Sequence, residues 1–211
     1  MLRERMVRFQ LAGRGINDQR VLAVMGEVPR HWFCLPETLA ADAYGDYPLP
    51  IGWGQTISQP LMVATMLQHM LLSGNETVLE VGTGSGYNAA LLGRLALRVI
   101  SLEIVPELVA RAKVLLQSGG FSNVEVLQAD GSQGWPAAAP YDAIVVTAGA
   151  PMVAGVLKEQ LRVGGRLVIP VGNKMQQRVQ VIQRTAEGFT AEEFEECRFV
   201  PLYGKYGWAD S

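Results

Sequence analysis

Cysteine and histidine are scarce in this sequence of 211 residues. There are two cysteines, Cys34 and Cys197, and two histidines, and the cysteines lack the C-x-x-C spacing of a metal-binding or redox motif. This excludes a disulfide framework and indicates no metal site. Two thiols that stay reduced are typical of an intracellular protein, so we expect a cytoplasmic location.

Long apolar runs and concentrated charge are also missing. No uninterrupted apolar segment approaches the roughly 18 residues that a membrane span needs. The first residues, "MLRERMVRFQ", carry charge and lack the apolar centre of a signal peptide. The net charge is −2 and the pI about 5.7. We therefore expect a soluble protein with no membrane association and no dedicated nucleic-acid surface.

Apolar residues make up 49% of the chain and charged residues 18%, which is enough to bury a large core. We expect one domain over 1–211, with a helical appendage and a loop in 1–60, an α/β core in 61–172 and a C-terminal hairpin and tail in 173–211. Proline and glycine crowd the stretch 43–58, which predicts an irregular ordered loop. Ser58 is a candidate N-cap for the helix that follows, with Pro60 in its first turn.

From Thr77 onwards, strand and helix patterns alternate. Apolar, β-branched runs are followed by helical segments, which predicts a mostly parallel sheet with helices on both faces. The expected strands are 77–82, 98–104, 124–130, 141–149 and 165–172, and the expected helices are 87–96, 106–120 and 152–161. Two further extended runs, 178–185 and 189–202, surround a short glycine turn and predict an antiparallel hairpin.

The strongest chemical signal is the glycine loop "VLEVGTGSGY" at 78–87. A strand that enters a glycine-rich turn and opens a helix can hold a nucleotide-like ligand at the helix N-terminus. The segment Gly82-Thr83-Gly84 would form this turn. A dinucleotide fingerprint, G-x-G-x-x-G, needs a third glycine where Tyr87 stands, so a nicotinamide-linked dehydrogenase is the least favoured function.

Three acidic residues accompany the loop, each near the end of a successive strand. Glu80 would repel a pyrophosphate but suits a cationic amino-acid ligand. Glu103, 19 residues after Gly84, can accept both ribose hydroxyls. Asp130 can accept a hydrogen bond from an exocyclic amine such as that of adenine. Recognition of ribose and adenine without phosphate indicates S-adenosylmethionine, and thus a Rossmann-like methyltransferase fold.

Beyond the glycine loop, the sequence resembles the protein-L-isoaspartate (D-aspartate) O-methyltransferases over almost its whole length. The segments that carry the resemblance are "PLPIGWGQTISQP" (48–60), "VLEVGTGSGYNAA" (78–90), "ADGSQGWP" (129–136), "APYDAIVVTAGAP" (139–151), "QLRVGGRLVIPVG" (160–172) and "RFVPL" (198–202). The G-Q-T-I-S-Q-P portion is the most specific. Trp53, Ala129 and Gly149 depart from the usual family pattern.

The resemblance implies transfer of a methyl group to the free carboxylate of isoaspartyl residues in damaged proteins, and possibly of D-aspartyl residues. The ester then closes to a succinimide, which begins repair. It also implies site residues: catalytic Ser58; cofactor-binding Thr56, Glu80, Gly82, Thr83, Gly84, Glu103, Asp130 and Gly131; and substrate-binding Ile57, Ser58, Val200 and Pro201. The expected partners are isoaspartyl peptides and proteins, and the expected state is a monomer.

Methyl transfer to a carboxylate is compatible with the residues of this sequence. A carboxylate is already ionised at neutral pH, so it needs alignment and exclusion of water rather than a strong base. No G-x-S-x-G motif surrounds Ser58, which argues against a hydrolase. Two alternatives remain open from the sequence: a methyltransferase for another acceptor, such as a small molecule or RNA, and a non-catalytic S-adenosylmethionine-binding protein.

Overall fold

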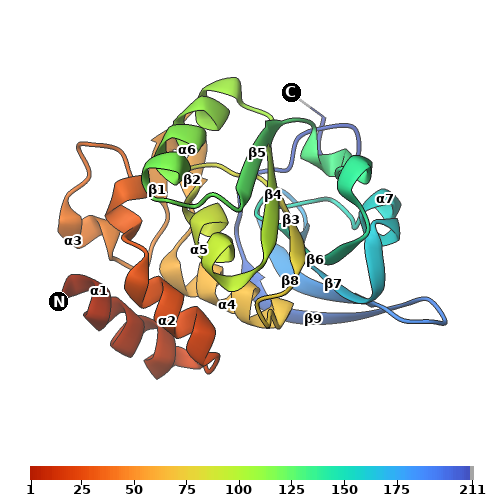
Figure 1. Cartoon of the computed structure of the whole chain (residues 1–211), viewed down its shortest axis with the longest axis horizontal. Coiled ribbons are helices and arrows are strands. Elements are labelled where there is room, and N and C mark those ends of the chain that lie inside the picture. Colours follow the sequence, from red (N-terminus) through yellow and green to blue (C-terminus); the bar gives the residue numbers. More distant parts are fainter. Residues whose placement is uncertain (210–211) are drawn as a thin grey trace.

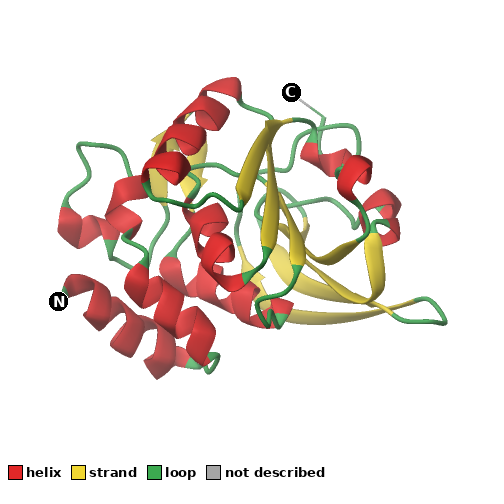
Figure 2. Cartoon of the chain, in the orientation of Figure 1, coloured by secondary structure: helices red, strands yellow, loops and turns green. Residues whose placement is uncertain are grey.

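The computed structural model describes residues 1–209, and its centre is a seven-stranded sheet in the order β5-β4-β3-β6-β7-β8-β9 (Figures 1 and 2). The strands are β3 (Thr77–Val81), β4 (Arg98–Glu103), β5 (Val124–Gln128), β6 (Tyr141–Val146), β7 (Leu161–Gly172), β8 (Gln177–Arg184) and β9 (Phe189–Cys197). Strands β3 to β7 pair in parallel, and β8 and β9 continue the sheet antiparallel. The prediction of a mostly parallel sheet that ends in an antiparallel hairpin is confirmed.

Side chains of the central strands alternate between two buried layers. Val78, Val99 and Val145 belong to one apolar cluster, whereas their neighbours Leu79 and Ile100 belong to another on the opposite face. The first layer is covered by α4 (Pro60–Met70), α5 (Tyr87–Leu95) and α6 (Pro106–Ser118), and the second by α7 (Gly155–Glu159) and the 3-10 turns Gly131–Gln133 and Pro136–Ala138 (Figure 1). Within residues 1–209 no helix is both long and apolar enough to cross a bilayer.

The order of the strands creates a switch point beside β3. The chain runs from β3 outward through β4 and β5, then returns to pair β6 with the other side of β3. The connections after β3 and β6 therefore leave in opposite directions. In sheets of this kind, ligands bind in the crevice outside the carboxyl ends of the two diverging strands.

The N-terminal appendage is helical, as expected. It comprises α1 (Leu2–Arg5), a π-helical segment (Met6–Leu11), α2 (Gln19–Glu27), α3 (Ala40–Ala43) and 3-10 turns at Ala12–Arg14 and Arg30–Phe33. The carboxylate of Asp18 accepts hydrogen bonds from the backbone N–H groups of Arg20 and Val21, so Asp18 is the N-cap of α2. Buried Met6, Met25 and other apolar residues join this appendage to the main core.

The proline- and glycine-rich stretch is more regular than predicted. Strands β1 (Leu49–Gly52) and β2 (Gln55–Ile57) form an antiparallel hairpin within it. Pro50 is tolerated because β1 has a single partner strand, so the missing N–H need not break a ladder on both sides. Trp53 and Gly54 form the turn, and both have positive φ, 51° and 69°. Asparagine or glycine usually occupies the first of these turn positions, so the backbone at Trp53 is strained.

The prediction that Ser58 caps the next helix is wrong. Helix α4 begins at Pro60 with Gln59 at the N-cap position, and the Gln59 side chain makes no capping bond. The carboxylate of Asp46 takes this role from a distance in sequence: one oxygen accepts the N–H of Leu61 at 3.0 Å, and the other pairs with Arg14. An anionic acceptor satisfies a free N–H at the positive end of the helix and leaves Ser58 available for another role.

The helix expected over 152–161 is shorter, and the following strand is longer. Helix α7 covers only Gly155–Glu159, and β7 begins at Leu161, which pairs with Tyr141 of β6. Gly164, at φ 85°, lies inside β7 at an irregularity in its pairing with β6. Gly164 and Gly165 therefore belong to a bulge within the strand and do not separate the helix from the strand.

The strain at Trp53 gives a test by substitution. We expect Trp53→Gly to be more stable than Trp53→Ala by about 1 kcal/mol, because only glycine accepts positive φ without a steric penalty. This reverses the usual order, in which glycine is the less stable of the two. Urea unfolding of the two variants measures the difference. An alanine variant of equal or greater stability would contradict the strained turn.

Candidate active site

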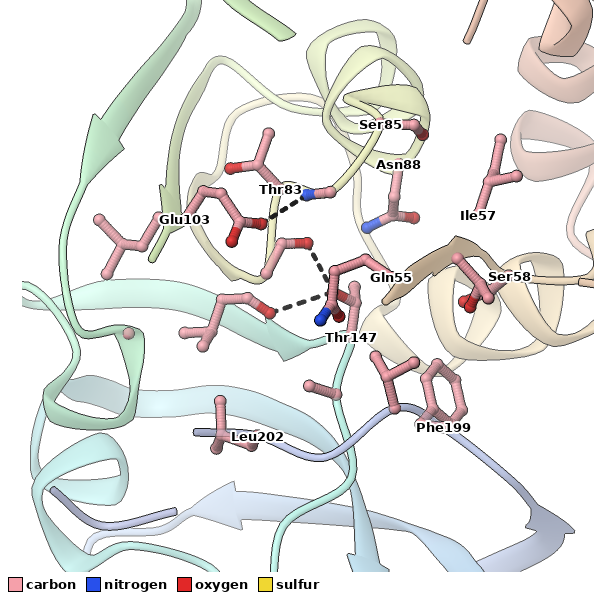
Figure 3. Close-up of a pocket in the computed structure, with 18 of the residues that line it drawn as sticks. Gln55, Ile57, Ser58, Thr83, Ser85, Asn88, Glu103, Thr147, Phe199 and Leu202 are labelled. Carbon is pink, nitrogen blue, oxygen red and sulfur yellow. Dashed lines mark hydrogen bonds between the residues drawn. The ribbon is translucent and has the colours of Figure 1, made fainter. Parts of the chain in front are cut away.

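A pocket opens at the switch point, between the carboxyl ends of β3, β4 and β6 (Figure 3). Its empty volume is about 1020 Å³, which includes open solvent at its mouth. Of the predicted site residues, ten line it: Thr56, Ile57, Ser58, Gly82, Thr83, Gly84, Glu103, Gly131, Val200 and Pro201. Glu80 and Asp130 are not among the lining residues.

Gly82 shapes the floor of the pocket. Beyond Val81 the chain bends towards β4, and the N–H of Gly82 donates to the carbonyl of Leu102 at 2.8 Å. Thr147, at the end of β6, donates its hydroxyl to the Gly82 carbonyl at 2.6 Å (Figure 3). A Cβ at position 82 would lie 2.5 Å from that hydroxyl oxygen, and φ is 98°. Glycine is thus required where two strand ends meet.

Glu103 lies where a ribose-binding carboxylate was predicted. One carboxylate oxygen accepts the N–H of Gly84 at 2.8 Å, which joins the second strand end to the glycine loop (Figure 3). The other accepts the N–H groups of Ile104 and Val105 at 2.8 and 3.0 Å. These bonds fix the carboxylate at the pocket wall. Carboxylate oxygens have about four acceptor positions in all, so one remains for a ligand hydroxyl.

Glu80 is fully buried behind the pocket, and its carboxylate does not reach the lining surface. It accepts hydrogen bonds from Ser101 Oγ and, at 2.8 Å, from Asn88 Nδ2. Burial raises the pKa of Glu80 to about 7; the two hydrogen bonds oppose this rise, and the nearby Glu103 carboxylate adds to it. Because Asn88 does line the pocket, Glu80 acts on the site by orienting the Asn88 amide.

Asp130 follows β5, as expected, but it is not among the residues that line this pocket. One carboxylate oxygen accepts the N–H and hydroxyl of Ser132, and the other accepts Gln133 Nε2 at 3.0 Å and the N–H of Lys205 at 2.9 Å. Burial alone would raise its pKa, but these donors hold the pKa below its ordinary value. A bond to adenine would require one donor to be given up. In this structure Asp130 fastens the C-terminal segment to the sheet.

That C-terminal segment, residues 199–206, forms one wall of the pocket. The carbonyl of Val200 accepts the N–H of Gly149 at 2.8 Å, and the N–H of Leu202 donates to the Gly149 carbonyl at 2.9 Å. The segment therefore pairs with the chain just beyond β6. Its residues Phe199 to Tyr203 line the pocket, so the predicted pair Val200 and Pro201 shares the pocket with the hairpin residues.

Another wall is the end of the hairpin, Gln55 to Ser58, and Ser58 is drawn near Phe199 of the C-terminal segment (Figure 3). Within residues 1–209 the hydroxyl of Ser58 makes no hydrogen bond, whereas its backbone carbonyl accepts Arg30 Nη1 at 2.8 Å. A serine hydroxyl on a fixed backbone with no internal partner is free to bind a ligand. The structure thus brings Ser58 within the same pocket as Gly84 and Glu103.

Several lining residues were not predicted from the sequence, namely Gln55, Ser85, Asn88, Thr147, Phe199, Leu202 and Tyr203. Thr147 could have been found, because it is the polar residue at the end of the fourth parallel strand, as Glu103 is at the end of the second. Asn88 could not, because its role depends on contact with Glu80 across the first turn of α5. Neither histidine lines the pocket: His31 bonds Tyr44 and His69 packs on Phe194.

A parallel sheet with a glycine loop at its switch point and a carboxylate at the next strand end is a Rossmann-like nucleotide-binding arrangement. Tyr87, in place of the third glycine of the dinucleotide motif, favours a methyltransferase over a dehydrogenase. In the part of the chain described, no three His, Cys, Asp or Glu side chains are grouped to hold a metal ion.

Comparison with known proteins specifies the family. The family model of protein-L-isoaspartate(D-aspartate) O-methyltransferase (PCMT) matches residues 2–207. Protein-L-isoaspartate O-methyltransferase 2 of Marinobacter nauticus is 52% identical over 98% of this chain and 95% of its own length. The enzyme of Methanoregula boonei is 50% identical over 98% of this chain and 94% of its own length.

Solved structures agree. A protein-L-isoaspartate O-methyltransferase superposes with a TM-score of 0.88 at 29% identity, over 97% of this chain and 67% of the other. A Plasmodium falciparum protein described as a putative member, in complex with S-adenosyl-L-homocysteine, gives 0.82 at 25% identity over 95% and 98% of the two chains. The chain belongs to the protein-L-isoaspartate (D-aspartate) O-methyltransferase family, and the predicted carboxyl methyltransferase activity is confirmed.

The raised pKa of Glu80 gives a prediction about pH. The folded-state pKa of about 7 exceeds the ordinary value of 4.5, so the folded protein holds a proton that the unfolded chain releases between these values. Stability from this group therefore falls as pH rises through that window, by at most about 1.4 kcal/mol per pH unit. We expect Glu80→Gln to gain stability relative to the wild type from pH 5 to pH 7.

Urea unfolding of both proteins at several pH values measures the difference. Because the two proteins share every other titrating group, their difference isolates Glu80. A difference that stays constant with pH would contradict a raised pKa.

Proposed function

We propose that the pocket binds S-adenosylmethionine along the glycine loop and presents its methyl group to an isoaspartyl carboxylate held between the hairpin and the C-terminal segment. The observation that carries this proposal is the position of Ser58, whose unpaired hydroxyl shares one pocket with Gly84 and Glu103. One side of the pocket suits the cofactor, and the other suits the acceptor.

The fit to the cofactor is supported by the polar groups of the pocket. Glu103 keeps one acceptor position for a ribose hydroxyl, and Gly82, Thr83 and Gly84 bring backbone close to a ligand. We propose that Asn88, oriented by Glu80, contacts the amino-acid end. Gly131 packs tightly, since a Cβ there would lie 2.5 Å from Val81 Cγ1. Thr56 and Gly131 would then adjoin the cofactor from opposite sides.

The residues of the chain have a limited chemical task. S-adenosylmethionine supplies a methyl group on a positively charged sulfur, and the acceptor carboxylate forms the new C–O bond as the C–S bond breaks. A carboxylate of ordinary pKa needs no base for this attack, which agrees with a pocket that neither histidine lines. Ser58 would donate a hydrogen bond to one carboxylate oxygen and direct the other towards the methyl group.

We also propose the substrates of the protein, its oligomeric state and its location in the cell. The substrates are isoaspartyl residues exposed on damaged proteins, held by Ile57, Ser58, Val200 and Pro201. Methylation would lead to a succinimide and so to repair, and D-aspartyl acceptors are included as a second substrate class. We further propose a monomer that acts in the cytoplasm without nucleic acid. The pI of about 5.7 supports the last point.

A pair of peptides tests the acceptor. With labelled S-adenosylmethionine, we expect base-labile label on a peptide that contains isoaspartate and none on the same sequence with normal aspartate. In the isoaspartyl peptide the free group is the α-carboxylate, bonded directly to Cα. In the normal peptide it is the β-carboxylate, one CH₂ group further from Cα. Equal labelling of both peptides, or binding of the cofactor without any transfer, would exclude this acceptor.

Two variants test the division of the pocket. We expect Ser58→Ala to lower kcat/KM for the isoaspartyl peptide by about ten- to hundredfold, because one hydrogen bond to an ionised group is lost. Its affinity for S-adenosylhomocysteine should stay within about twofold of the wild type. Glu103→Gln should instead weaken the binding of S-adenosylhomocysteine, measured by calorimetry. A Ser58→Ala protein with weak nucleotide binding and normal turnover would show the assignment to be incorrect.

A further inference from the structure

Arg30 is a fully buried arginine whose hydrogen bonds go only to backbone carbonyls. It lies in the 3-10 turn Arg30–Phe33 of the appendage. Its Nε donates to the carbonyl of Ala43 and its Nη1 to that of Ser58, each at 2.8 Å. Its Nη2 is buried and has no hydrogen-bond partner among the described residues. The guanidinium thus joins the two ends of the loop that carries the hairpin.

The charge of Arg30 is not neutralised by a carboxylate. Burial lowers the pKa of the guanidinium, but arginine stays protonated in proteins. The titratable groups that face it are those of Tyr87, Cys34, Asp46 and Tyr44. The tyrosines and the cysteine are uncharged at neutral pH, with pKa values raised by burial. No carboxylate in residues 1–209 lies within 4 Å of Arg30, and Asp46 already binds Arg14 and the N–H of Leu61.

The guanidinium of Arg30 lies next to two residues that line the pocket. The guanidinium carbon lies 5.5 Å from the centre of the Tyr87 ring, and both Tyr87 and Ser58 line the pocket. The charge is therefore directly behind the wall where the acceptor would bind. A buried charge without a partner is costly, and a neutral amide could hold a carbonyl at a lower cost in desolvation. The positive charge itself therefore needs an explanation.

We propose that Arg30 is a positioning residue for the acceptor. It fixes the backbone of Ser58 through its carbonyl, and its unneutralised charge makes the space in front of Ser58 favour a carboxylate over a neutral group. Low-dielectric surroundings strengthen this effect, because few water molecules screen the charge. The inference rests on the proposed function of the pocket and adds to it the source of selectivity for a charged acceptor.

Binding of two peptides measures this selectivity. One contains isoaspartate; the other has the same sequence with the α-carboxylate replaced by a carboxamide, which is neutral and nearly equal in shape. Affinities are measured by calorimetry with saturating S-adenosylhomocysteine. We expect the wild type to prefer the carboxylate peptide by about tenfold or more. Arg30→Gln should reduce this preference to about twofold, whereas Arg30→Lys, which keeps the charge, should retain most of it.

Arg111 provides the matched control. Its guanidinium also holds backbone carbonyls, those of Ile51 at 3.3 Å and Cys34 at 2.5 Å, but not that of Ser58. We expect Arg111→Gln to lower the melting temperature and to keep the wild-type preference between the peptides. A loss of preference in Arg111→Gln equal to that in Arg30→Gln would reduce Arg30 to a general structural role and overturn the proposal.

Other outcomes are equally decisive. A wild-type protein that binds both peptides alike overturns the proposal without any variant. An Arg30→Lys protein that loses the preference overturns it too, which keeps the test valid if Arg30→Gln does not fold. Failure of the function is separate: the wild type would then transfer no methyl group to the isoaspartyl peptide. A wild type that methylates the peptide, with unchanged preference in Arg30→Gln, contradicts only the role of Arg30.

Discussion

The separation of β3 from β6 beyond Val81 is the constraint on which the pocket depends. Both strands are paired up to this point, and then Gly82 bends towards β4 while Thr147 holds its carbonyl from the β6 side. The glycine loop, Glu103 and the C-terminal segment all take their positions from this divergence. A side chain at position 82 would push the two strand ends apart, because its Cβ would overlap the Thr147 hydroxyl.

The acceptor side of the pocket has a different basis. Two arginines of other elements bind the backbone of the loop from Ala43 to Pro60: Arg30 at both ends and Arg111 on the hairpin. Within the loop, Asp46 binds the first turn of α4. Charged donors and acceptors make stronger hydrogen bonds than neutral ones, so a few contacts order a long loop. The same ordering leaves the Ser58 hydroxyl free and exposed to the pocket.

Much of this arrangement could be predicted. Apolar, β-branched runs alternating with helical segments indicated the parallel sheet, and a glycine loop before a helix located the ligand. The strand-end position of Glu103 was sufficient to place it, since carboxyl ends of parallel strands share one edge. The same reasoning did not describe Glu80 and Asp130, because it could not tell that Asn88 and Ser101 surround one carboxylate, and that Lys205 binds the other.

The sequence by itself determined the fold class, the glycine loop as the ligand-binding element and the family, because these depend on local periodicity and on motifs that are contiguous in the chain. Only the tertiary structure decided which polar groups remain available to a ligand. Ser58 is free because Asp46 caps α4 in its place, and a cation lies behind Ser58 because the chain folds Arg30 against it. These two contacts join residues that are 15 and 28 positions apart, and no local pattern records them.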